Sequence, residues 1–280
     1  MPYKTILVIL DTADNTRVAV DFAAAFAKEH DARIVGLHAE IVSAVPLVAP
    51  MEIPDPVAVQ ALQDMARKQA IDIERLFRTK MEREGIAYEW RSIGSSVGYG
   101  SQPLMEIARS ADLLVAVQPD PAKSSDSQVD VESFLFESGR PVLLIPYIFS
   151  EPKPIRRVLI AWNGSKEAAR ATFDALPFLK TADSVEVFSV DTADSSTHSP
   201  SETGAEITAT LVRHGIRARQ ETAMCGGRTP SQVIENRLAD DSIDLLVMGA
   251  YTHSWLWQLI FGGTTRTLLQ SMTAMTLLAR

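Results

Sequence analysis

The chain has 280 residues, of which 46% are hydrophobic and 22% charged, as in folded globular proteins and unlike disordered ones. Its formal net charge of −8 argues against a nucleic-acid-binding surface, which normally needs a basic stripe. The single cysteine, Cys225, excludes an internal disulfide and suits a reducing compartment. No apolar run approaches the roughly 20 residues of a membrane helix, and Asp11 comes too early for a secretory signal. We therefore expect a cytoplasmic protein with no membrane or nucleic-acid partner.

In the first half of the chain, short apolar runs alternate with helical stretches. Strands are expected at 4–11, 32–40, 87–92, 111–115 and 141–146, and helices at 18–30, 59–83 and 102–109. An additional segment at 41–56, IVSAVPLVAPMEIPDP, has too many prolines for a regular helix and too many apolar residues for a free linker. We expect it to cover a sheet face or to line a dimer contact, with a ligand lid as the alternative.

The second half repeats this order after the linker EPKPIRR at 151–157. Strands are expected at 156–163, 184–191, 217–223, 243–247 and 275–279, and helices at 166–180, 203–214, 230–239 and 264–271. KTILVILD (4–11) aligns with RRVLIAWN (156–163), and ADLLV (111–115) aligns with IDLLV (243–247). This internal repeat predicts two domains, 1–150 and 155–280.

The strands are continuous apolar runs instead of alternating ones. Such runs fit strands that are buried on both faces, in a parallel sheet covered by helices. Right-handed crossovers then give a doubly wound arrangement. The sequence thus predicts an α/β fold of two tandem doubly wound, Rossmann-like domains, each with a five-stranded parallel sheet flanked by helices.

Ligands of open α/β sheets bind outside the carboxyl ends of the strands, near the point where the strand order reverses. In the second half, these ends supply Asn163, the Val190–Asp191 pair and the loop that starts at Gly249. Asn163 could hydrogen-bond an adenine or a ribose. The alternative is that it caps the following helix, with Gly164 giving the freedom to turn.

Gly262, Gly263, Thr264 and Thr265 open the last helical stretch. Backbone N–H groups at a helix start can bind phosphate, and the two threonines add hydroxyls. The alternative is a plain glycine turn with a threonine cap. The GxxxxGK[ST] and GxGxxG patterns are both absent. The histidines show no metal-ligand spacing and Cys225 has no histidine beside it in sequence, so we expect neither a metal site nor catalytic residues.

Three stretches resemble the universal stress protein family: VLIAWNGSKEAARA (158–171), IDLLVMGAYTHS (243–254) and FGGTTRTLL (261–269). Nearly the whole chain is similar to a tandem of two such domains. The resemblance implies a five-stranded parallel sheet of the adenine nucleotide alpha hydrolase-like type. It also implies, for part of the family, binding of ATP or a related adenine nucleotide through a G-x2-G-x9-G-[ST] pattern after the fourth strand.

Laid on this chain, the pattern places Gly249 at its first glycine and Thr252 at its second. The nine-residue gap runs from His253 to Phe261. Gly262 then matches the third glycine, and Gly263 takes the Ser/Thr position with Thr264 and Thr265 next in the chain. The resemblance also implies that Asn163, in place of an aspartate, and the backbone of Val190 contact adenine.

The first half departs further from the family pattern. Asp11 keeps the acid that follows the first strand, and Ala39 falls at the second-strand contact. After the fourth strand, VAVQPDPAKSSDSQVDVESF (115–134) has no glycine pattern and carries four acids that would repel phosphate. We therefore expect the first half to be a structural or partner-binding copy.

The sequence leads to a stress-response protein that binds ATP, ADP or AMP in its second domain, with at most weak ATP hydrolysis. Mg²⁺ would accompany the ligand only if a triphosphate binds. The alternatives are a dimeric interaction module that binds no nucleotide and, less favoured, a nucleotidyl-transferring enzyme. Trp255 and Trp257 are expected to pack between domains or protomers, with adenine stacking as the alternative.

Overall fold

The computed structural model describes residues 2–41, 56–95, 102–120, 131–191, 200–250 and 273–280. The chain divides into two compact units, Tyr3–Ser138 (the N-terminal unit) and, mainly, Gly139–Arg280 (the C-terminal unit). Most of the segment predicted at 41–56, the predicted helix 264–271 and the two tryptophans of the last loop lie outside the described residues.

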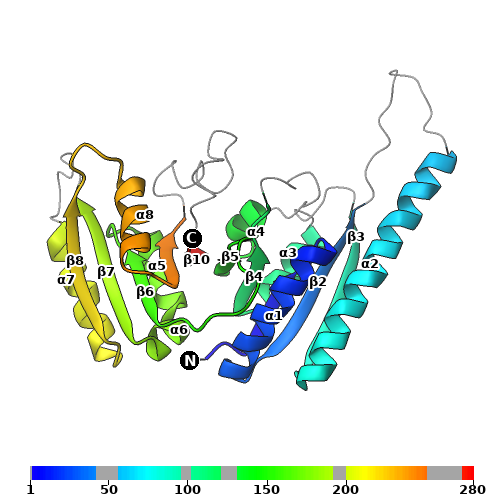
Figure 1. Ribbon diagram of the computed structural model, residues 1–280, viewed down its shortest axis with the longest axis horizontal. Coiled ribbons are helices and arrows are strands. Elements are labelled where there is room, and N and C mark those ends of the chain that lie inside the picture. The colour runs from blue at the N-terminus through cyan, green and yellow to red at the C-terminus, as the bar shows by residue number, and fades with distance from the viewer. Residues whose placement is uncertain (1, 42–55, 96–101, 121–130, 192–199, 251–272) are drawn as a thin grey trace. The chain divides into compact units, whose positions relative to one another are not determined.

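The N-terminal unit contains parallel strands in the order β3-β2-β1-β4. The strands are β1 (Thr5–Ile9), β2 (Arg33–Ile41), β3 (Tyr88–Ser95) and β4 (Leu113–Val117). The helices are α1 (Ala13–His30), α2 (Pro56–Glu84), α3 (Gln102–Arg109) and α4 (Val131–Glu137). Figure 1 shows α1 and α2 side by side along the sheet. Helix α4 was not predicted from the sequence.

The packing of α2 on the sheet depends on one glycine of β2. A Cβ atom at Gly36 would lie 2.9 Å from the ring of Phe77, which is fully buried. Helix α1 is capped at its N-terminus by Thr12, whose side chain accepts a hydrogen bond from the Asn15 N–H, and at its C-terminus by Asp31, which has the left-handed conformation. Its alanine-rich face lets it approach the strands closely.

The C-terminal unit has the strand order β5-β10-β9-β6-β7-β8. The strands are β5 (Val142–Ile145), β6 (Arg157–Ala161), β7 (Ser184–Asp191), β8 (Ala218–Met224), β9 (Leu245–Gly249) and β10 (Met275–Ala279). The helices are α5 (Lys166–Asp174), α6 (Leu176–Thr181), α7 (Pro200–Arg213) and α8 (Pro230–Asp240). All neighbouring strands are parallel except β5, which runs antiparallel to β10.

The α/β fold with a mostly parallel sheet flanked by helices is confirmed. The prediction of one helix over 166–180 was wrong, because the structure divides it into α5 and α6 at Ala175. Pro177, in the first turn of α6, accounts for the break, since proline has no N–H for a continuous helix and its ring clashes with the preceding turn.

The order of the strands fixes where a ligand can bind. In the C-terminal unit, the chain runs from β6 outward through β7 to β8 and then returns to β9 on the other side of β6. In the N-terminal unit, β1 and β4 have the same relationship. The crevice favoured in such sheets therefore lies beyond the carboxyl ends of β6 and β9, and of β1 and β4.

Candidate functional site

Three of the predicted site residues are described, and all three lie at this edge of the C-terminal unit. Asn163 follows β6, Val190 is the penultimate residue of β7, and Gly249 ends β9. These strands are neighbours in the sheet. The other predicted site residues lie outside the described residues and remain predictions: Thr252, His253, Gly262, Gly263, Thr264 and Thr265.

Asn163 does not cap α5, so that alternative was wrong. The helix cap is Ser165, whose Oγ accepts a hydrogen bond from the Ala168 N–H at 3.1 Å. The Asn163 Oδ1 instead accepts from the Ser165 N–H at 3.1 Å, and Gly164 turns between them with a φ of 73°. The Asn163 side chain is exposed, and its amide nitrogen makes no hydrogen bond to the described part of the chain.

Gly249 brings β9 into direct contact with the start of α5. A Cβ atom at this position would lie 2.4 Å from the Ala168 nitrogen and 2.4 Å from the Glu167 carbonyl carbon. Close packing of a strand end on a helix explains why this residue is glycine without any ligand. It also sets the positively polarised N-terminus of α5 beside the crevice, where it can attract an anion.

Two buried polar atoms at this edge were not predicted from the sequence. Trp162 Nε1 and Ser189 Oγ are shielded from solvent, and neither has a hydrogen-bond partner in the described part of the chain. The backbone N–H of Trp162 donates to the Phe188 carbonyl at 2.9 Å, so Trp162 lies alongside β7. An unsatisfied buried polar group costs about 1–3 kcal/mol. A hydrogen bond between either atom and a ligand or an ordered water would remove this cost.

At the corresponding edge of the N-terminal unit, Asp11 is hydrogen-bonded to neighbouring residues of the same unit. The buried Asp11 Oδ1 accepts from the Thr12 N–H at 2.7 Å and from Asn15 Nδ2 at 3.2 Å. Gln69 Nε2 of α2 donates to the Asp11 carbonyl at 2.9 Å. These bonds tie the end of β1 to α1 and α2.

A second buried residue at that edge is His38 of β2. Its Nδ1 lies 2.7 Å from the Leu10 carbonyl oxygen, and its ring stacks on Trp90 with centroids 6.1 Å apart. The pKa of His38 is lowered, because the effect of burial outweighs the raising effects of that carbonyl and of nearby carboxylates. The neutral imidazole is thus a packing element of the N-terminal unit.

Glu186, the third residue of β7, is a buried carboxylate that pairs with two arginines. Its side chain is 4% exposed and bonds Arg237 of α8 at 2.8 Å and Arg219 of β8 at 2.7 Å. Burial by itself raises the pKa of Glu186, but the two arginines outweigh it and hold the pKa below its usual value. Because Glu186 lies away from the carboxyl edge of the sheet, we interpret this network of ion pairs as structural.

The described residues include no group of three histidine, cysteine, aspartate or glutamate side chains that could hold a metal ion. None of the described helices combines the length and the apolar character of a bilayer-spanning segment. Cys225 is half-buried in a loop with two glycines at positive φ, after β8. Within the described part of the chain, nothing supports a metal centre.

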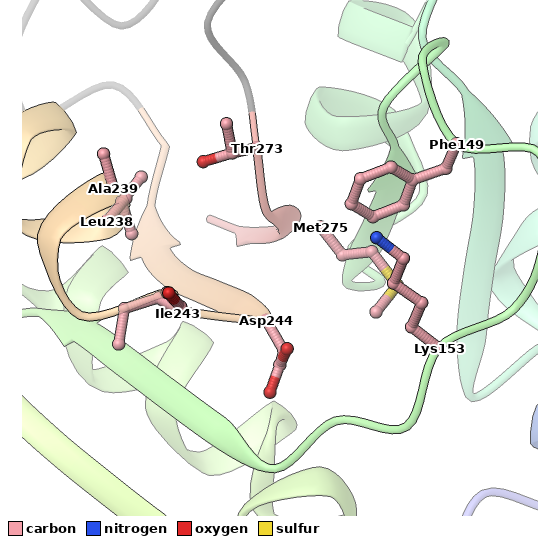
Figure 2. Close-up of a pocket in the computed structure, with 9 residues that line it drawn as sticks. Phe149, Lys153, Leu238, Ala239, Ile243, Asp244, Thr273 and Met275 are labelled. Carbon is pink, nitrogen blue, oxygen red and sulfur yellow. The ribbon is translucent and has the colours of Figure 1, made fainter.

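A hollow of about 330 Å³ lies at the opposite, amino edge of the same sheet (Figure 2). Asp244, which precedes β9, and Met275, the first residue of β10, form part of its wall. The Asp244 Oδ2 accepts hydrogen bonds from the backbone N–H groups of Arg156 and Arg157, at 2.9 and 2.8 Å. The hollow contains none of the predicted site residues, so the structure separates it from the candidate nucleotide site.

Comparisons with known proteins agree with this fold. Residues 154–280 match the Universal stress protein family. A universal stress protein from Archaeoglobus fulgidus DSM 4304 is 16% identical, with a TM-score of 0.69 over 99% of this chain and 96% of that chain. A Pseudomonas aeruginosa UCBPP-PA14 protein described as a universal stress protein is 15% identical, with a TM-score of 0.57 over 99% of this chain and 93% of that chain.

A universal stress protein in complex with cAMP is 22% identical and covers 52% of this chain and 98% of that chain, with a TM-score of 0.36. No curated protein matches the sequence. The chain has the fold of the two proteins that match over nearly its full length, and residues 154–280 form a universal stress protein domain.

Proposed function

We propose that this chain is a stress-response protein of two tandem universal stress protein domains, 1–150 and 155–280, and that the second binds an adenine nucleotide without significant turnover. The observation that carries the proposal is the convergence at one edge of a matched family domain. Trp162, Asn163 and the N-terminus of α5 follow β6, and Ser189 lies near the carboxyl end of β7; Trp162 Nε1 and Ser189 Oγ have no partner in the described part of the chain. Together they offer donors and acceptors for a base and a positive pole for phosphate.

The roles divide between described and undescribed residues. The Asn163 amide and the Val190 backbone hold the adenine, and the chain from Gly249 leads to the ribose and phosphates. Gly262, Gly263 and Thr265 are proposed to contact the ribose and phosphates, and Thr252, His253 and Thr264 complete the proposed site. A bound triphosphate would bring Mg²⁺ held mainly by its own phosphate oxygens and water.

Weak turnover is proposed because the cations of the described edge are poorly placed to stabilise a reacting phosphate. The Lys166 side chain is 92% exposed, and Arg228 is exposed after β8. Such charges are screened by water and contribute little to a transition state, which needs donors fixed in a site that excludes water.

We further propose a cytoplasmic protein in which the two predicted domains pair within one chain or across a homodimer. The antiparallel pairing of β5 with β10 supports pairing within one chain, because β5 belongs to the first predicted domain and β10 to the second, and the structure places both strands in the C-terminal unit. The register places Leu144 opposite Thr276 and Val142 opposite Leu278.

The alternative is a dimeric interaction module that has lost nucleotide binding. Two observations favour it: contact with α5 alone accounts for Gly249, and threonine stands at position 252 where the family pattern has glycine. If backbone with positive φ is needed at 252, threonine is costly there.

The test is to denature the purified protein, look for released nucleotide by mass spectrometry, and then titrate the apoprotein with ATP, ADP, AMP and cAMP by calorimetry. Binding of at least one adenine nucleotide is expected. The double variant Gly262→Val, Gly263→Val should lose it, since valine blocks backbone approach to phosphate. No binding at millimolar concentration would remove the nucleotide proposal in favour of the interaction module.

A further inference from the structure

A groove between α1 and α2 of the N-terminal unit forms a hollow of about 390 Å³. The two helices lie side by side in Figure 1. Side chains of both helices line it: Thr16, Arg17, Val20, Asp21, Arg75, Leu76, Thr79, Lys80 and Arg83. Its volume lies in the range of about 300–1,000 Å³ that is usual for small-molecule sites. No predicted site residue belongs to it.

The groove has an excess of positive charge, although the whole chain carries a net charge of −8. Asp21 is the single carboxylate among the lining residues, and its Oδ1 forms an ion pair with Lys80 Nζ at 2.5 Å. Arg75 pairs with Asp72 at 2.8 Å, but the Arg75 side chain is 72% exposed and that of Asp72 is 42% exposed. Exposed pairs of this kind contribute only about 0–1 kcal/mol, so Arg75 can turn to a bound anion at little cost.

Arg17 carries the charge that the groove leaves uncompensated. It makes no ion pair with the described part of the chain. The repeat supplies its counterpart: RVAVD (17–21) in α1 aligns with RATFD (170–174) in α5, counted from the caps Thr12 and Ser165. In α5, Arg170 is neutralised by Asp174 at 2.7 Å.

The difference between the two copies has a specific cause. In α1, the equivalent aspartate, Asp21, bonds Lys80 of α2. Arg17 therefore has no ion-pair partner in the described part of the chain, whereas Arg170 pairs with Asp174 and also donates to the Gly139 carbonyl at 3.3 Å. The equivalent arginine thus has an ion-pair partner in α5 and none in α1, within the described part of the chain.

The interior of the groove combines a polar atom without a partner and an apolar floor. Thr16 is fully buried, and its Oγ1 forms no hydrogen bond with the described part of the chain. Val20 is buried and Leu76 half-buried, so they form an apolar floor beside that hydroxyl. A buried hydroxyl without a partner is unfavourable, and a ligand acceptor would satisfy it.

We propose that this groove is a binding site for a small organic anion with an apolar body, such as an aromatic phosphate ester. The anionic group pairs with Arg17 and Arg75 and accepts from Thr16 Oγ1, and the apolar body lies on Val20 and Leu76. Guanidinium groups suit phosphate and carboxylate because they donate two parallel hydrogen bonds. The site is separate from the nucleotide site proposed for the second domain.

The test is calorimetric titration of the full-length protein with phenyl phosphate at low ionic strength, with inorganic phosphate and phenol as comparison probes. Phenyl phosphate is expected to bind at least about tenfold more tightly than either, because only it uses both the cations and the floor. Arg17→Gln should weaken it about tenfold, and its matched control Arg170→Gln should leave it unchanged.

A second variant separates binding from folding. Thr16→Val keeps the shape of the side chain and removes a hydroxyl that has no partner in the protein, so the melting temperature should not fall. Phenyl phosphate affinity should fall about threefold to tenfold. The proposal is overturned if phenyl phosphate does not bind, if Arg17→Gln leaves binding unchanged, or if Arg170→Gln weakens it equally. Loss of binding in Gly262→Val, Gly263→Val but not in Arg17→Gln would assign the probe to the nucleotide site and overturn it as well.

Discussion

Gly249, the last residue of β9, lies against the backbone of Ala168 so closely that a Cβ atom would stand 2.4 Å from the Ala168 nitrogen. This contact joins the end of one strand to the first turn of the helix that follows another. It positions the N-terminus of α5 at the point where the strand order reverses, which is where the proposed nucleotide site lies.

The first prediction follows from that contact. Gly249→Ala should lower the free energy of unfolding by about 1–3 kcal/mol, because the atoms it meets are backbone and cannot turn away. Gly94→Ala in β3 is the matched control, since nothing lies within 4 Å of its added Cβ. Urea denaturation of both variants measures the difference, and equal stability of the two would contradict the described contact.

The second prediction concerns the Glu186 network. Glu186→Gln should destabilise the protein by about 1.5–3 kcal/mol at pH 7, because it removes the charge that accepts hydrogen bonds from Arg237 and Arg219. Arg219 is largely exposed, so we expect the lower end of that range.

The pH dependence of that effect has a definite sign. The pKa of Glu186 is held low in the folded protein, so its contribution is present above the ordinary carboxyl pKa and is lost as the pH falls through the lowered value. The stability difference between the protein and Glu186→Gln should therefore narrow below about pH 4. A difference that stays constant from pH 7 to pH 3 would contradict this pairing.

The third prediction concerns Glu235, a carboxyl whose pKa is raised instead of lowered. Burial raises the pKa of Glu235 in α8, and its Oε1 has no partner in the described part of the chain. A raised pKa favours folding at low pH, and this contribution is lost as the pH rises through the folded value. Glu235→Gln should thus raise the melting temperature at pH 7 more than at pH 4. The exposed Glu206→Gln is the control; the same response from both variants would show that burial is not the cause.

The fourth prediction separates ligand contacts from structural ones at the carboxyl edge. Ser189→Ala and Trp162→Phe should each lower the affinity for an adenine nucleotide about threefold to tenfold, because each removes a group that can hydrogen-bond the ligand. Neither should lower the melting temperature through a lost hydrogen bond. Trp90→Phe in the N-terminal unit serves as the control. Unchanged affinity in both test variants would exclude these atoms from the site.

The sequence predicted the elements well where apolar patterns were strong. β7, β10 and α3 have the bounds that were expected from their runs. The short α4 was missed because it follows a stretch that is rich in charged and turn-forming residues. The break between α5 and α6 was missed although Pro177 marks it, because the apolar pattern continues across the proline.

The site was less predictable than the fold, for a physical reason. The sequence left two roles open for Asn163, an adenine contact or the cap of α5. Only the folded structure shows that the cap is Ser165, whose Oγ accepts from the Ala168 N–H. The unpartnered state of Trp162 and Ser189 depends on what packs around them. Arg17 has no ion-pair partner in the described part of the chain because Lys80, which is distant in the sequence, pairs with Asp21. Such pairings are properties of the packed structure.

Amide hydrogen exchange, compared with and without saturating ATP or AMP, tests the central claim most directly because it locates the ligand. Added nucleotide should slow exchange in 162–168 and 188–191, at the carboxyl edge of the second domain, and leave the corresponding edge at 10–16 unchanged. Protection confined to 10–16, or no change in either region under conditions where calorimetry shows binding, would contradict a nucleotide site in the second domain.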